Sequence, residues 1–188
     1  MSEVAAPRAD RRALTWAVKA SFLGYVNRMR GRITLVKPAY PAAAGFAFPY
    51  APAAYRAEGG AAAPDAGERA LPAAELAFTG GVAFSAHGGM LDVTLAEPVL
   101  VFDDDGTLLT VADMRRPGTG IRAVIATLAS TPPAPTDETI ALVPLLTQDG
   151  AALFGGVYPP GEAMDPLFIP VSLLAGSTVT TPRLELCR

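Results

Sequence analysis

The chain has 188 residues, of which 51% are hydrophobic and 18% are charged, so it has the length of about one average domain and is not a polar, disordered polypeptide. Fifteen Lys and Arg residues against 18 Asp and Glu residues give a formal net charge of −3. Because no basic excess is available to neutralise phosphates, a nucleic-acid partner is not expected.

The cysteine and histidine content restricts the metal chemistry. Cys187 is the single cysteine, which excludes an intrachain disulfide, a CxxC motif and a cysteine-built zinc site. His87 is the single histidine, which excludes an HExxH motif and any centre with several histidine ligands.

No targeting or membrane-spanning segment is recognisable. The apolar stretch after Arg12 is interrupted by Lys19 and has no small-residue cleavage pattern behind it, so it does not resemble a signal peptide. No run of 18 or more apolar residues occurs, and no membrane span is expected. As written, the chain is expected to be cytoplasmic. The alternative is an exported or cell-surface domain whose leader has been removed.

The N-terminal part of the chain predicts one long helix. We expect residues 1–12 to be a flexible segment and residues 13–188 to form a single domain. The helix is expected from Ala13 to about Met29, because this stretch has no proline and Asp10 precedes it as an N-cap. Its apolar residues occupy two faces, so either the core or a bound apolar group should cover the second face.

Beyond this helix, short runs rich in Val, Ile, Thr and Phe alternate with Gly, Pro and Asp-Gly turns, which is typical of an antiparallel β-sandwich or a partly open barrel. The expected fold class is therefore mostly β, with the N-terminal α-helix and one further short helix near Gly150 or after Pro170. Residues 38–72 are dominated by Ala, Pro and Gly and are expected to form a long loop around one strand. The expected strands are Arg32–Lys37, Gly45–Pro49, Glu75–Ser85, Met90–Phe102, Thr107–Asp113, Ile121–Leu128, Ile140–Leu146 and Pro170–Thr180.

Two Asp-Gly pairs predict turns. Asp105-Gly106 indicates a hairpin and Asp149-Gly150 a second turn. The acidic run that begins at Asp103 also suggests calcium, but Leu108 and Met114 stand where a calcium loop needs Gly and Glu. We therefore interpret this run as a turn.

Two hydroxyl side chains share one face of the expected helix. Ser21 and Tyr25 are four residues apart, which places them one turn, or about 6 Å, apart along the helix axis. Hydroxyls on an apolar face cost free energy unless they find a partner. They are either core groups bonded to nearby backbone or water, or members of a polar site.

The histidine follows an expected strand. The alternating run from Phe78 to Phe84 leads to His87, and a Gly-Gly turn comes directly after it. His87 is either an ordinary surface residue at a strand end or part of a site. A serine hydrolase would pair it with Ser85 or Ser21 and with Asp92, but the sequence has no GxSxG elbow.

Three segments together resemble a known family. The strings LTWAVKASFLGYV, FTGGVAFSAHGGMLDVTLAEP and GAALFGGVYPPGEAMDP lie in this order between Leu14 and Pro166. They are similar to the HtaA domain, the haem-binding module of actinobacterial haem uptake. The resemblance implies a mostly β fold whose N-terminal helix supplies a tyrosine ligand to ferric haem b. It implies haem capture, transport, buffering or transfer without catalytic turnover, and other haem-uptake or haem-acceptor proteins as partners.

Carried over position by position, the resemblance assigns four residues to the haem site. Tyr25 matches the axial ligand to the iron, and His87 matches the histidine that hydrogen-bonds the ligand oxygen. Ser21 matches the residue that touches a propionate, and Tyr158 matches the aromatic residue beside the porphyrin. Val157 departs from the pattern, because family members often carry a second aromatic residue there.

The chemistry of these residue types agrees with the resemblance. A phenolate is a hard, anionic oxygen donor that favours ferric iron, and tyrosine is a known axial ligand of haem. Free tyrosine has a pKa of about 10, so the iron and a hydrogen bond from His87 would together have to hold the deprotonated form. Arg28 or Arg30 could approach a propionate.

Three arrangements stay open beside this reading of the sequence. A haem-dependent peroxidase or catalase-like enzyme would use the same ligand, since catalase also uses tyrosinate. A β-sandwich interaction module without a cofactor would use Tyr25 and His87 only as packing residues. A homodimer is conceivable, because a partly exposed porphyrin is itself an apolar patch.

Overall fold

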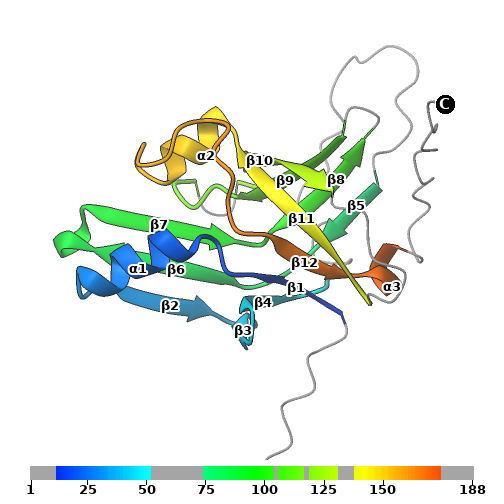
Figure 1. The fold of residues 1–188 in the computed structure, drawn as a ribbon, viewed down its shortest axis with the longest axis horizontal. Helices are drawn as coiled ribbons and strands as arrows, with labels where there is room; N and C mark the ends of the chain where they lie inside the picture. Colours follow the sequence, from blue (N-terminus) through cyan, green and yellow to red (C-terminus); the bar gives the residue numbers. More distant parts are fainter. Residues whose placement is uncertain (1–11, 52–73, 104–105, 117–118, 131–137, 175–188) are drawn as a thin grey trace, which may run out of the picture.

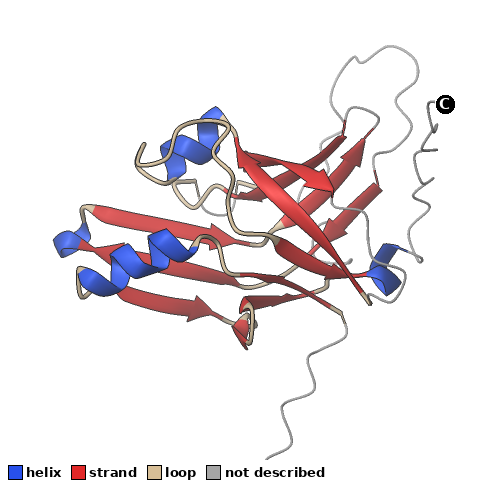
Figure 2. Cartoon of the chain, in the orientation of Figure 1, coloured by secondary structure: helices blue, strands red, loops and turns tan. Residues whose placement is uncertain are grey.

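Two antiparallel sheets dominate the computed structural model, which describes residues 12–51, 74–103, 106–116, 119–130 and 138–174. The strands are β1 (Ala13–Trp16), β2 (Arg32–Val36), β3 (Tyr40–Ala42), β4 (Gly45–Pro49), β5 (Ala74–Ala77), β6 (Gly81–Ala86), β7 (Leu91–Ala96), β8 (Val99–Asp103), β9 (Gly106–Ala112), β10 (Arg122–Ser130), β11 (Thr139–Leu146) and β12 (Leu167–Pro170). The larger sheet has the order β3-β4-β1-β12-β11-β10-β9-β8-β5, and the smaller has the order β2-β6-β7 (Figure 1). Neither sheet closes, so the predicted mostly β, partly open fold is confirmed (Figure 2).

Several expected segments lie outside the described residues. These are residues 1–11 of the expected flexible segment, residues 52–72 of the expected long loop and residues 175–180 of the last expected strand. The described part of the expected loop holds β3 and β4, of which β4 has the predicted bounds.

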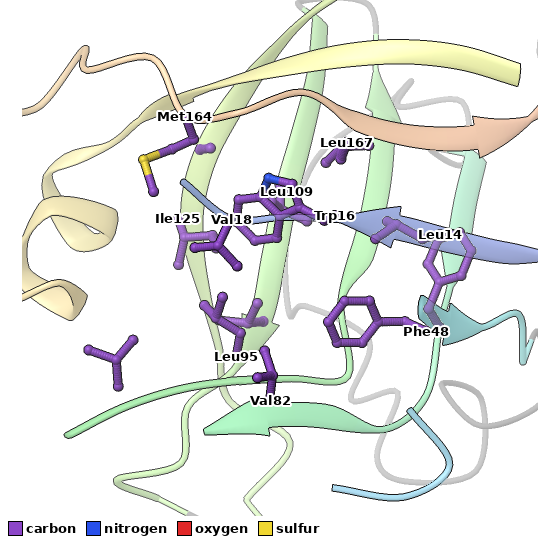
Figure 3. Close-up of a cluster of buried hydrophobic side chains, with 14 of the residues drawn as sticks. Leu14, Trp16, Val18, Phe48, Val82, Leu95, Leu109, Ile125, Met164 and Leu167 are labelled. Atoms are coloured by element: carbon purple, nitrogen blue, oxygen red, sulfur yellow. The ribbon is translucent and has the colours of Figure 1, made fainter. Parts of the chain in front are cut away.

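The hydrophobic core joins side chains from both sheets. Figure 3 shows Trp16 and Phe48 of the larger sheet in the same cluster as Val82 and Leu95 of the smaller sheet. All four are at most 2% exposed, and burying one large apolar side chain contributes about 1.5–3 kcal/mol. The same cluster extends beneath the N-terminal helix, where Phe22 is buried.

The predicted helix Ala13–Met29 is wrong over residues 13–19. Residues Ala13–Trp16 form β1, and the helix α1 spans Ala20–Arg28. The strand pairs with β4 on one side and β12 on the other, so its backbone groups are satisfied by two neighbours that a local pattern does not reveal. The chain leaves the strand through Val18, whose φ of 66° is unfavourable for a β-branched residue.

Two expected strands are each divided between the two sheets. The run predicted as Glu75–Ser85 is β5 and β6, and the run predicted as Met90–Phe102 is β7 and β8. The breaks lie side by side, because the Glu97 N–H donates to the Gly80 carbonyl over 2.8 Å. Both residues have positive φ, and a Cβ on Gly80 would lie 2.4 Å from the Ala39 nitrogen. Each of the two expected strands therefore crosses from one sheet to the other at this point.

Both expected positions for a further short helix are helical. The helix α2 spans Gln148–Leu153 and α3 spans Val171–Leu174. The expectation of a turn at Asp149-Gly150 is therefore wrong, and so is the expected strand over residues 171–174, whereas Pro170 itself ends β12. The Thr147 hydroxyl accepts a hydrogen bond from the Gly150 N–H and caps α2. The strands β8 and β9 pair as an antiparallel hairpin with Asp103 opposite Gly106, while Asp105 of the expected turn lies outside the described residues. Among the described residues, none of the helices has the length and apolar character needed to span a bilayer.

Candidate functional site

The helix α1 has one buried face and one polar face. Phe22 and Val26 are 2% and 0% exposed and fix its inward side. The Phe22 ring meets Phe84 of β6 and Phe154 after α2 in edge-to-face contacts, with centroids 5.1 and 5.2 Å away. Because a helix turns once in about 3.6 residues, Ser21 stands exposed beside this face, while Tyr25 lies at its edge, half-buried against the core cluster.

Tyr25 meets His87 on the outward side. The hydroxyl oxygen of Tyr25 lies 2.7 Å from Nε2 of His87, and the two residues are 62 positions apart in the sequence. Their rings are tilted by 39° with centroids 5.8 Å apart, so they meet through the polar atoms rather than by stacking. The structure therefore brings together the predicted iron ligand and the predicted partner of its oxygen.

The turn between β6 and β7 presents the imidazole. His87 opens the short 3-10 helix η1 (His87–Gly89) and has a φ of 52°, a left-handed conformation that histidine adopts more readily than most residues. Gly88 and Gly89, which complete this turn after His87, also have positive φ and carry no side chain that could crowd the imidazole. The imidazole is exposed and the Tyr25 ring is half-buried against the core cluster, so a ligand can reach their contact from the solvent side.

A second pair lies one helical turn away. The hydroxyl oxygens of Ser21 and Tyr158 are 3.0 Å apart, and either can donate. Tyr158 follows α2, and its ring stands edge-on to Phe154 with centroids 6.2 Å apart. The Lys19 ammonium lies 5.2 Å from the centre of the same ring. All four predicted site residues therefore fall into two hydrogen-bonded pairs on one side of α1, while Val157 beside them is 65% exposed.

Three residues outside the predicted site hold the segment after α2 against the start of α1. The Asp165 carboxylate accepts from the Ala20 N–H over 2.8 Å and caps the helix. The Lys19 ammonium forms a 2.8 Å ion pair with Glu162. Glu162 and Asp165 belong to the string that carried the family resemblance, but their spacing gave no sign that they bind the helix start.

The donor set of the site consists of oxygen and imidazole nitrogen. Within the described ranges, no three His, Cys, Asp or Glu side chains gather as ligands for a metal ion. A deprotonated phenol oxygen can act alone as an anionic ligand to a metal, and the N–H of a neighbouring imidazole can stabilise its charge by a hydrogen bond. No hydrogen bond among the described residues joins His87 to Ser21 or Ser85, so the arrangement does not match a serine-hydrolase triad.

The fold and the site together define a domain of two open antiparallel sheets, in which a tyrosine on the N-terminal helix pairs with a histidine from the turn between β6 and β7. The HtaA family model, described as Htaa, matches residues 11–169. The chain belongs to the HtaA family, and the resemblance stated from the sequence is confirmed.

Solved structures with similar folds come from Corynebacterium glutamicum. The N-terminal domain of HtaA is 25% identical with a TM-score of 0.58, over 82% of this chain and 92% of that one. The C-terminal domain of HtaA is 24% identical with a TM-score of 0.56, over 83% of this chain and 92% of that one. The heme binding protein HtaB is 19% identical with a TM-score of 0.54, over 84% of this chain and 90% of that one. No curated protein sequence matches the chain.

Proposed function

We propose that this protein binds ferric haem b, with the Tyr25 phenolate as the axial ligand to the iron and with His87 donating a hydrogen bond to the same oxygen. The observation that carries the proposal is the 2.7 Å contact between His87 Nε2 and the Tyr25 oxygen. Family membership supports it, as does the fold shared with a protein described as a heme binding protein.

The protonation states follow from the chemistry of the pair. A phenolate oxygen only accepts hydrogen bonds, so His87 must present its Nε2 proton when Tyr25 is deprotonated. A charge-assisted bond of this kind is roughly twice as strong as a neutral one. Ferric iron is hard and prefers such an oxygen, whereas ferrous iron prefers softer donors. The pair therefore favours the oxidised form of the cofactor.

Ser21 and Tyr158 suit the polar rim of the same ligand. Each hydroxyl can donate one proton, and only one of the two is used in their mutual 3.0 Å contact. The remaining proton is free to donate to a carboxylate, so a propionate would bind between or beside them. The apolar body of the porphyrin would then lie against the half-buried rings of Tyr25 and Tyr158.

The biological role that fits this arrangement is capture, transport, buffering or transfer of haem, without turnover. His87 is the single histidine of the chain and is occupied with the Tyr25 oxygen, so it is not available as an acid or base for peroxide chemistry. A loaded protein that turns over peroxide well above the rate of free haem would support the peroxidase alternative and contradict this role.

The test is a titration with ferric haem of the wild type, Tyr25→Phe and Tyr50→Phe. Wild type and Tyr50→Phe should give the same tyrosinate-type spectrum, because the Tyr50 ring packs on Phe78 away from the pair. Tyr25→Phe should lose that spectrum and bind at least about 100-fold more weakly, since removing a ligand costs more than removing its hydrogen-bond partner. A wild type without the tyrosinate spectrum, or a Tyr25→Phe variant that keeps it, would contradict the proposal.

A further inference from the structure

Arg28 lies on the same outward face of α1 as the two hydroxyl residues. At about 100° per residue, Arg28 is roughly 20° from Ser21 and roughly 60° from Tyr25 around the helix axis. It is exposed, whereas Phe22 and Val26 occupy the opposite side. A basic residue therefore continues the row of polar side chains beyond the proposed iron ligand.

The guanidinium of Arg28 folds back along the helix. Its Nη1 atom lies 3.6 Å from the position that a Cβ would take on Gly24, one turn before Arg28. Side chains in a helix lean toward its N-terminus, and Gly24 has no side chain that would lift the guanidinium from the helix surface. This places the cation at the level of Gly24, about 4.5 Å along the axis from Ser21.

Arg28 has no anionic partner within the described part of the chain. The ion pairs there join Lys19 to Glu162 and Arg115 to Asp113. The other helix-end cation, Arg30, differs in position, because it follows the last turn with a φ of 51° and its N–H bonds to the Asn27 carbonyl. Of the two arginines that the sequence offered for a propionate, the structure favours Arg28.

We propose that Arg28 binds the second carboxylate of the haem, while Ser21 and Tyr158 bind the first. This inference rests on the proposed function. One carboxylate of the haem would bind to two neutral hydroxyl groups and the other to a guanidinium. A guanidinium can bind a carboxylate through two parallel N–H groups. The site would therefore select metalloporphyrins with two free carboxylates over neutral porphyrin esters.

The experiment compares Arg28→Gln with the matched variant Arg30→Gln, using ferric haem and its dimethyl ester as probes in the same solvent mixture. Arg28→Gln should weaken ferric haem binding about three- to tenfold, as expected for a partly exposed charge-assisted bond, and should keep the tyrosinate spectrum. Arg30→Gln should stay within about twofold of the wild type. The dimethyl ester should bind equally to the wild type and to Arg28→Gln.

Two further readouts separate a direct contact from an effect on the helix. The salt dependence of haem affinity should be smaller in Arg28→Gln, because one screened charge pair is gone, and Arg28→Lys should retain most of the affinity. Equal affinities of Arg28→Gln and Arg30→Gln for ferric haem would overturn the assignment. An equal loss for haem and for its ester would overturn it as well. The proposed function fails separately, if the wild type itself shows no tyrosinate spectrum.

Discussion

The two faces of α1 perform different tasks. The inward face holds Phe22 and Val26 among buried rings from β6 and from the segment after α2. The outward face holds Ser21 and Tyr25, whose partners lie 137 and 62 residues away in the sequence. Packing on one side sets the rotation of the helix, and hydrogen bonds on the other side build the site. Stability and ligand binding should therefore respond to different substitutions.

The largest expected effect is a loss of stability when a residue of the inward face of α1 is replaced. Phe22→Ala should lower the free energy of unfolding by about 3–5 kcal/mol, because it removes a fully buried ring and leaves a cavity. Phe22→Leu, which keeps most of the apolar volume, should cost about 1.5 kcal/mol or less. Denaturant unfolding of the apo protein measures both. A loss below about 1 kcal/mol for Phe22→Ala would show that this face does not anchor the helix.

The second largest effect is expected from His87→Ala, which should weaken ligand binding and leave the fold intact. His87→Ala removes an exposed side chain but places alanine at a left-handed φ of 52°, so its unfolding free energy should fall by about 1 kcal/mol or less. Its affinity for ferric haem should fall about 10- to 100-fold, as for other residues that hydrogen-bond a metal ligand.

The same variant should also respond differently to acid. Protons compete with iron for the phenolate, and His87 stabilises the unprotonated oxygen in the proposed complex. On acidification, the His87→Ala complex should therefore dissociate at a higher pH than the wild-type complex, as followed in the visible spectrum. Identical affinities and identical acid transitions would show that the 2.7 Å contact has no role in binding.

The smallest expected effect is a loss of stability when the hydrogen bond at the start of α1 is removed. Asp165→Ala removes the acceptor of the Ala20 N–H and should cost about 0.5–2 kcal/mol of stability, as for other helix caps. Asp165→Asn keeps an acceptor oxygen and should cost less. Thermal unfolding of the two variants measures the difference. If Asp165→Asn were as unstable as Asp165→Ala, the hydrogen bond would not be the stabilising element.

Local patterns predicted the site face better than they predicted the start of the helix. The spacing of Ser21 and Tyr25 placed them on one face, and they remain there although the helix begins at Ala20 instead of Ala13. The misassigned residues Ala13–Trp16 form a strand because β4 and β12 flank them. Neither neighbour is close in sequence, so no local signal could reveal them.

Contacts between distant segments were visible only through the family resemblance, or not at all. No spacing rule brings His87 to Tyr25 or Tyr158 to Ser21, and the resemblance alone suggested that they share a site. The crossing of both long strand runs between sheets at Gly80 and Glu97 was missed, although Gly80-Gly81 and Glu97-Pro98, which are unfavourable inside a strand, stand at the two breaks. The hydrogen bond from the Ala20 N–H to the Asp165 carboxylate likewise joins segments far apart in the sequence and follows no local pattern.

Ligation of the iron by Tyr25 is tested most directly by the resonance Raman spectrum of the ferric haem complex, excited in its ligand-to-iron charge-transfer band. We expect phenolate ring vibrations that shift when tyrosine is ring-deuterated and that disappear in Tyr25→Phe but persist in Tyr50→Phe. A complex without phenolate vibrations, or one that retains them in Tyr25→Phe, would contradict the assignment of Tyr25 as the iron ligand.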